Sequence, residues 1–237
     1  MSLRMAELTT SPTPPRANTT ESMHHPALDF ARWQRIAATL TTDITHCRDE
    51  LVRIIQQEKR IDQFWARSLI RSFLAYVESS VYEMRLVVSD AAEGGRIKLS
   101  PAERSLINEE TYELGENGKP QIRTRYLKIE RNFRFTTELF AQVFEVTADI
   151  DYAGTGWPAF LSAIKIRHRI THPRDPESID LSFLEAETVV TAFRWYLDAT
   201  DSLLNRSIAA LQAKNIQMQA ALSALTHART PELPPRG

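Results

Sequence analysis

Hydrophobic residues recur at steps of three and four along most of the chain, which is the spacing of one face of an α-helix. Two long helices are predicted in the proline-free interval before Pro101, one from about Phe30 to Ile54 and one from about Asp62 to Ala92. The apolar stripe of the first helix repeats like a heptad and contains Cys47, so this cysteine is expected in the core.

Helical spacing continues in the second half of the chain. Helices are predicted from about Ile129 to Val146 and from Trp157 to the residues before Pro173, because proline disfavours the helical conformation of the residue that precedes it. A last helix is expected to run from the capping box at 182–185 to about His227. Its stripe thins beyond about position 205, and we expect this part to project and to pair with a second subunit.

A capping box is also predicted at Ser100, with Glu103 as its acidic partner, and opens a short helix. The following segment, from Tyr112 to Lys128, breaks the helical pattern. Asn117-Gly118 is a turn signal between two short extended pieces, so a small inserted hairpin or ordered loop is expected.

The predicted fold class is therefore all-α, an antiparallel bundle of four to five main helices with a small inserted β-hairpin or loop. Residues 26–228 form one domain in this prediction. Residues 1–25 read as a disordered leader and residues 229–237 as a flexible tail, because neither shows an apolar period.

The amino-acid composition restricts the kinds of functional site that this chain can have. The formal net charge is −1, so a nucleic-acid site would have to be a local patch. Cys47 is the only cysteine, which excludes an intramolecular disulfide and fits a cytoplasmic protein. No apolar run approaches the roughly 18 residues of a membrane span. Gly-rich phosphate loops, nucleophile elbows and His-Glu-x-x-His motifs are absent from the sequence.

Six cations against one acid mark the segment from Lys119 to Arg134, with aromatic residues interleaved. Such a segment suits contact with phosphates and bases. The alternative is an ordinary solvated face whose acidic partners come from elsewhere in the fold. The candidate substrate-binding residues here are Arg125, Lys128 and Arg131.

The stretch IKIRHRITHP, residues 164–173, carries the strongest candidate chemistry. Helical geometry places Arg167 in the middle of an apolar face and puts His168 and His172, four residues apart, at one edge. Lys165 and Arg169 point the other way, as solvated charges do, and are further candidates for substrate binding. An arginine on an apolar face needs a partner or an anion.

Two interpretations follow from these residues alone. The histidine pair is spaced to hold a metal ion, although no third ligand stands out nearby. Alternatively, Arg167 pairs with a buried acid such as Glu78 and the histidines cap the helix end. Of the acids on the second helix, Glu78 lies at the edge of the apolar face and Glu83 lies well away from it.

Arg167, the polar His168 directly after it, His172 and Pro173 also resemble the signature motif of HEPN domains. The resemblance includes the position of the motif at the end of a late helix and the long amphipathic helix that follows. HEPN domains are all-helical, and many are metal-independent ribonucleases of bacterial toxin and anti-phage systems. In this family the motifs of two subunits meet across a dimer interface.

The resemblance implies a homodimer that cleaves RNA, with a possible antitoxin protein as partner and no metal or cofactor. Arg167 would stabilise the scissile phosphate, His172 would transfer a proton or orient the 2′-hydroxyl, and His168 would position the other two. The expected products are a 2′,3′-cyclic phosphate and a 5′-hydroxyl. The alternative function is a non-catalytic HEPN-like helical module that binds a protein partner or RNA.

Overall fold

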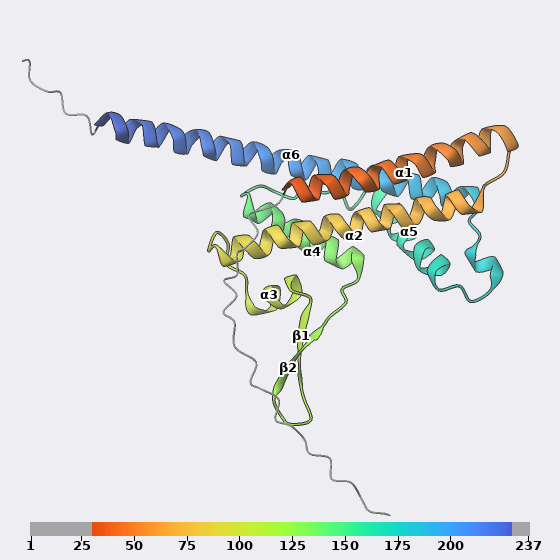
Figure 1. Ribbon diagram of the computed structural model, residues 1–237, viewed down its shortest axis with the longest axis horizontal. Coiled ribbons are helices and arrows are strands. Elements are labelled where there is room, and N and C mark those ends of the chain that lie inside the picture. The colour runs from red at the N-terminus through yellow and green to blue at the C-terminus, as the bar shows by residue number, and fades with distance from the viewer. Residues whose placement is uncertain (1–29, 229–237) are drawn as a thin grey trace, which may run out of the picture.

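The computed structural model describes residues 30–228, and these form a helical bundle with one small hairpin (Figure 1). The predicted all-α class is therefore confirmed. The predicted leader, residues 1–25, and the predicted tail, residues 229–237, lie outside the described residues. The elements are α1 (Phe30–Glu58), α2 (Gln63–Glu93), α3 (Pro101–Ile107), β1 (Glu110–Leu114), β2 (Pro120–Thr124), α4 (Ile129–Val143), α5 (Gly156–Thr171), the 3-10 turn η1 (Pro176–Ile179) and α6 (Phe183–Ala228).

Side-chain caps fix the starts of several helices. At α3 the Ser100 side chain accepts from the Glu103 amide while the Glu103 carboxylate accepts from the Ser100 amide, which confirms this capping box. Ser182 and Glu185 make the same reciprocal pair at the start of α6. Each cap satisfies amide groups that a helix terminus would otherwise leave without partners.

The core is centred on α2, which packs against α1, α4, α5 and α6. Phe73 of α2 meets Phe160 of α5 and Tyr196 of α6, and all three are fully buried. Where α5 begins, a Cβ on Gly156 would lie 2.2 Å from the Trp195 ring, so a residue with a side chain would not fit there. The helical spacing predicts an apolar face on α2, and all of its residues are buried: Ala66, Ile70, Phe73, Leu74, Val77, Val81, Met84 and Val88.

The prediction that Glu83 lies well away from the packed face of α2 is wrong. Its carboxylate is buried and accepts from Arg32 of α1 at 2.6 Å. The reason is that α1 and α4 cover different sides of α2, so α2 has more than one buried face.

Cys47 is buried, as predicted, and burial raises the pKa of its thiol, with Asp43 adding to the rise.

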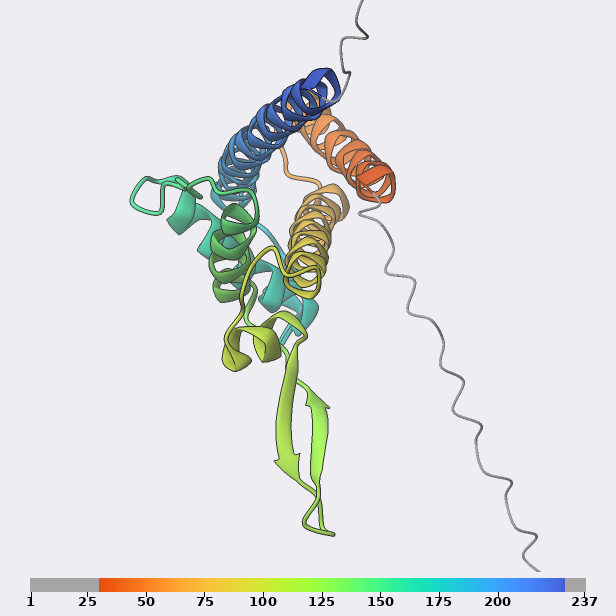
Figure 2. The ribbon, with the colours of Figure 1, turned by 90° about the vertical axis from the view of Figure 1, so that its left-hand side faces the viewer.

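The hairpin and the end of α6 both project from the bundle (Figures 1 and 2). β1 and β2 are antiparallel, with Tyr112 opposite Ile122 and Leu114 opposite Pro120. The sequence predicts the second extended piece at about 122–126, and β2 begins and ends two residues earlier than this. Within the described residues, no helix combines the length and the apolar composition that a membrane crossing requires.

Candidate functional site

Arg167 lies at the surface of α5, close to α2. One guanidinium nitrogen donates to Glu78 Oε1 at 3.3 Å, with side chains 38% and 51% exposed respectively. The predicted pairing forms, but neither partner is buried, because the buried face of α5 centres on Ala163, Ile166 and Ile170 and leaves Arg167 at its margin. A pair this exposed contributes little stability. The guanidinium therefore remains accessible to an anion.

His168 lies in the last turn of α5 beside Arg167, and His172 is the residue that follows the end of this helix. Both are exposed, and their ring centroids are 5.1 Å apart. The His172 amide donates to the His168 carbonyl at 3.0 Å, which ties His172 to the last turn of the helix. The motif residues are thus held on one short rigid segment, with both imidazoles open to solvent.

The histidine pair has no third ligand in the structure. Among residues 30–228, no group of three or more histidine, cysteine, aspartate or glutamate side chains is placed to hold a metal ion. Two ligands from one helix turn leave most of a tetrahedral coordination sphere unfilled. Within the described residues, the two imidazoles therefore do not form a complete metal site.

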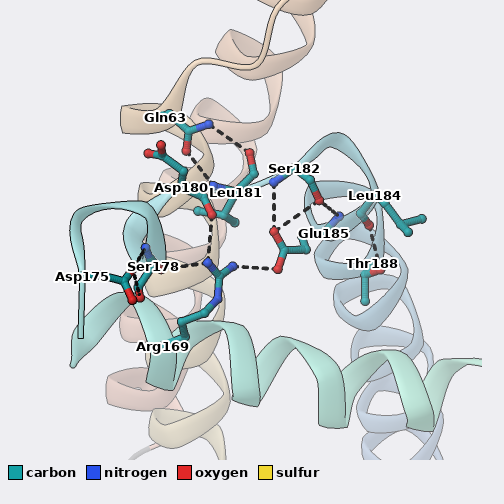
Figure 3. Close-up of polar contacts among 10 residues, drawn as sticks. All are labelled: Gln63, Arg169, Asp175, Ser178, Asp180, Leu181, Ser182, Leu184, Glu185 and Thr188. Atoms are coloured by element: carbon teal, nitrogen blue, oxygen red, sulfur yellow. Dashed lines mark hydrogen bonds and ion pairs between the residues drawn. The ribbon is translucent and has the colours of Figure 1, made fainter. Parts of the chain in front are cut away.

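Arg169 is not the solvated charge that the helical pattern predicts (Figure 3). Its guanidinium donates to the carbonyls of Ser178 and Asp180 at 2.8 and 2.9 Å and to Glu185 Oε1 at 2.6 Å. It thereby joins the end of α5, the η1 turn and the start of α6. With its donors used in this way, Arg169 is a structural residue that supports the candidate site.

Gln63 fixes the same segment from the other side. Its side-chain amide donates to the Leu181 carbonyl at 2.9 Å and accepts from the Leu181 amide at 2.8 Å. The connection after His172 is therefore held by α2 and α5 together. A site at the end of α5 needs such support, because a shift of about 1 Å in a catalytic group reduces rates strongly.

We expect Arg169→Ala to lower the free energy of unfolding by about 2 kcal/mol. The substitution removes three charge-assisted hydrogen bonds and leaves two carbonyl groups without the donor that they have in the folded protein. Urea denaturation followed by circular dichroism measures the change. Lys165→Ala is the matched control, since Lys165 is exposed on the same helix and should alter stability by no more than about 0.5 kcal/mol. Equal losses for both variants would contradict the structural role of Arg169.

Arg71 is a candidate that the sequence pattern did not single out. It lies on the side of α2 that also carries Arg67 and Glu78, because these positions share one face of a helix. Arg67 approaches Asp180 at 3.9 Å and Glu78 contacts Arg167, so this face of α2 borders the end of α5. Arg71 is exposed on this face between Arg67 and Glu78, so we expect it to add positive charge near the motif. The sequence feature that could have identified Arg71 is its spacing of seven residues from Glu78, which places both residues on one face of a helix.

The other predicted substrate-binding cations lie together on a second surface. Arg125, Lys128 and Arg131 line a cavity of about 290 Å³ at the start of α4. None of the three forms an ion pair with an acid in the part of the chain that the structure describes. Tyr126, 92% exposed, and the half-buried Phe135 line it too, so the cavity combines cations with aromatic rings.

The remaining members of this basic segment have other surroundings. Arg123 lies 3.3 Å from Glu113 across the hairpin, and the Arg134 guanidinium stacks over the Tyr152 ring at 4.4 Å. Phe133 is a fully buried core residue and is not available to a base. The cavity lining contains no residue of α5, so the candidate residues form two separate surfaces, one at Arg167 and one at Arg125.

The chain was also compared with known proteins. A scan against family models, a search of curated proteins and a search of solved structures each found no match.

Proposed function

We propose that the protein is a metal-independent endoribonuclease of the HEPN type, acting in the cytoplasm as a toxin or phage-defence effector. The observation that carries the proposal is the accessible Arg167 beside two exposed imidazoles at the C-terminal end of α5. Arginine keeps its charge at all physiological pH values, and imidazole exchanges protons near neutrality. These are the groups that cleavage of RNA by its own 2′-hydroxyl requires.

In the proposed reaction His172 accepts the proton of the 2′-hydroxyl as that oxygen attacks the neighbouring phosphorus. The new P–O2′ bond forms as the P–O5′ bond breaks, and the leaving 5′-oxygen takes a proton from a second imidazole. Arg167 stabilises the extra negative charge on the phosphorane oxygens. The products are a 2′,3′-cyclic phosphate and a 5′-hydroxyl. His168 positions the two groups.

A second copy of the chain supplies the second imidazole in this proposal. When two Arg167 surfaces face each other, their guanidinium groups repel unless an anion lies between them. An RNA phosphate is such an anion. Glu78 holds each Arg167 in place before RNA binds, and the exposure of this ion pair means that exchanging Glu78 for a phosphate costs little.

The basic cavity at the start of α4 supports the choice of RNA as substrate. Phosphates bind cations, and an unpaired base stacks on an exposed aromatic ring such as that of Tyr126. Replacing Arg125 and Arg131 together by glutamine should raise KM for a single-stranded RNA roughly tenfold while kcat changes little. The slope of log affinity against log salt should fall by about 1 for each contact removed.

Lys119→Gln is the control for this double variant, because Lys119 lies next to the hairpin turn and outside the cavity. It should leave both the KM and the salt dependence close to the wild-type values. If Lys119→Gln and the double variant weaken binding equally, the cavity is not an RNA subsite.

The second candidate function is a non-catalytic helical module that binds a protein partner, such as an antitoxin, or RNA. The hairpin favours it, because Tyr112, Leu114 and Ile122 share one exposed face of a two-stranded ribbon. Large exposed apolar residues grouped on one face are typical of interaction surfaces. This function predicts RNA or protein binding with no cleavage.

The test that separates the two functions is incubation of purified protein with a fluorescent single-stranded RNA in excess chelator. The ribonuclease should cut the RNA and leave DNA of the same sequence intact, because DNA lacks the 2′-hydroxyl. Binding without cleavage in this assay would replace the proposed function by the binding module.

A further inference from the structure

The C-terminal half of α6 extends beyond the rest of the bundle (Figure 1). Its sequence carries an apolar stripe. Its positions alternate steps of four and three, which is the heptad spacing of a coiled coil. Ile208, Leu211, Met218 and Leu225 are exposed large hydrophobic residues on this stripe. The complete set of stripe positions is Leu204, Ile208, Leu211, Asn215, Met218, Leu222 and Leu225.

We infer that this stripe, residues 208–225, pairs with the same segment of a second copy as an antiparallel coiled coil. The inference does not depend on the proposed function. Exposed apolar residues grouped on one face of a projecting helix are costly in water. A second copy offers a partner of the same length and spacing, as a two-fold contact requires.

The groove next to the stripe sets the orientation of the pair. Leu204 and Ile208 line a cavity of about 230 Å³ whose other walls include Trp33 and Ala37 of α1 and Met84 of α2. In a parallel pair the partner's bundle would have to occupy the space in front of Leu204, where α1 and α2 of this copy already lie. An antiparallel pair places the two bundles at opposite ends and avoids this overlap.

A heptad has two core positions, a and d. In an antiparallel pair each a position packs against a d position of the partner, and this rule fixes the register. Position 208 then meets 225 of the partner copy, 211 meets 222, and 215 meets 218. Each copy's C-terminal turn reaches the mouth of the other copy's groove. The two Asn215 side chains fall in the two central layers, where their amides can reach one another or water and disfavour other registers.

The flanks of the stripe are compatible with this pairing. In an antiparallel pair, Gln212 faces position 219 of the other copy, which is also glutamine, and Lys214 faces position 221, which is alanine. No like charges therefore meet along the contact. Within its own copy Lys214 already pairs with Glu145 at 2.7 Å, so its charge has a partner.

The α6 contact is distinct from the contact that would join two Arg167 surfaces. Arg169 binds Glu185 at the start of α6, and about 40 residues of helix, or roughly 60 Å, separate that position from Leu225. Pairing through α6 therefore leaves the Arg167 surface of each copy accessible. Its failure would leave the proposed cleavage chemistry untouched.

The first test is the mass of the full-length protein in solution by light scattering. Met218→Glu combined with Leu225→Glu should halve the mass of the assembly. Ile216→Glu is the matched control, because Ile216 is as exposed and lies on the same helix but off the stripe. It should leave the mass unchanged. An unchanged mass in the double variant would show that residues 208–225 do not pair, whatever else covers them, and would overturn the inference.

The second test fixes the direction by oxidative cross-linking. Ile208→Cys combined with Leu225→Cys should give a covalent dimer, whereas Leu225→Cys alone should not. The two positions lie about 25 Å apart on one helix, so they cannot bridge within a chain. The wild type is the background control, because its Cys47 is buried. A dimer from Leu225→Cys alone would mean parallel pairing, and no dimer from either variant would contradict the pairing itself.

Discussion

Arg167→Ala should reduce the rate of RNA cleavage at least a hundredfold. The guanidinium is the only group of the motif with a permanent charge, and removing one donor from a developing phosphorane costs about 10²–10³ in rate. His172→Ala should cost about 10²–10⁴, the usual range for a general acid or base. Single-turnover cleavage of a labelled RNA measures both, because it reports the chemical step rather than product release.

Two controls separate loss of chemistry from loss of structure. Both variants should unfold at urea concentrations close to that of the wild type, because His172 is exposed and the partly exposed Arg167 makes only a weak surface ion pair. Lys165→Ala, on the opposite side of the same helix, should keep the single-turnover rate at saturating RNA, because a candidate substrate-binding residue affects affinity and not the chemical step. Cleavage that survives both Arg167→Ala and His172→Ala would remove these residues from the reaction.

Phe160→Ala should lower the free energy of unfolding by about 4 kcal/mol. Phe160 is fully buried and its ring contacts those of Phe73, Phe133 and Tyr196. Deleting a buried phenyl group removes its hydrophobic burial and leaves a cavity among rigid rings, which costs about 3–5 kcal/mol. Because this cluster joins α2, α4, α5 and α6, the loss should appear as one cooperative transition at a lower midpoint.

Urea denaturation followed by circular dichroism tests this prediction, with Phe64→Ala as the matched control. Phe64 is 61% exposed near the start of α2, and its ring contacts that of Trp65. Its loss should cost less than about 1 kcal/mol. Similar losses for the two phenylalanines would contradict the view that the aromatic cluster of α5 holds the bundle together.

Local patterns were sufficient to predict most of the fold. Helix starts could be located because Ser100 and Ser182 each stand three residues before a glutamate. The hairpin was predicted from one Asn-Gly turn, and Gly118 does adopt a positive φ of 70°. The end of α4 was placed too late, because Glu145, with a positive φ of 57°, interrupts the helix without any glycine or proline to mark it.

Contacts between distant elements could not be predicted in the same way. Glu83 looks solvent-facing when α2 is considered as a helix with one buried side, and only the packing of α1 buries it against Arg32. Arg169 looks solvated for the same reason, until the η1 turn brings two carbonyls to it. Both errors arise because helical periodicity gives the direction of a side chain but not the element that lies there.

Only part of the candidate site could be predicted from the sequence, for a related reason. The three motif residues lie within six positions of one another, so helix geometry alone places them together. Arg125, Lys128 and Arg131 were grouped by charge, and the structure places all three at one cavity. Arg71 was missed, because its approach to the motif depends on how α2 and α5 pack.

The most direct measurement for the central claim is the chemical nature of the RNA ends after cleavage in the presence of EDTA. Mass spectrometry of the fragments should show a 2′,3′-cyclic phosphate on one product and a 5′-hydroxyl on the other. Substrates with a single 2′-deoxy substitution at the cleaved nucleotide should resist cutting. A 5′-phosphate with a 3′-hydroxyl, or cleavage that requires a divalent metal ion, would contradict the mechanism built on Arg167 and His172.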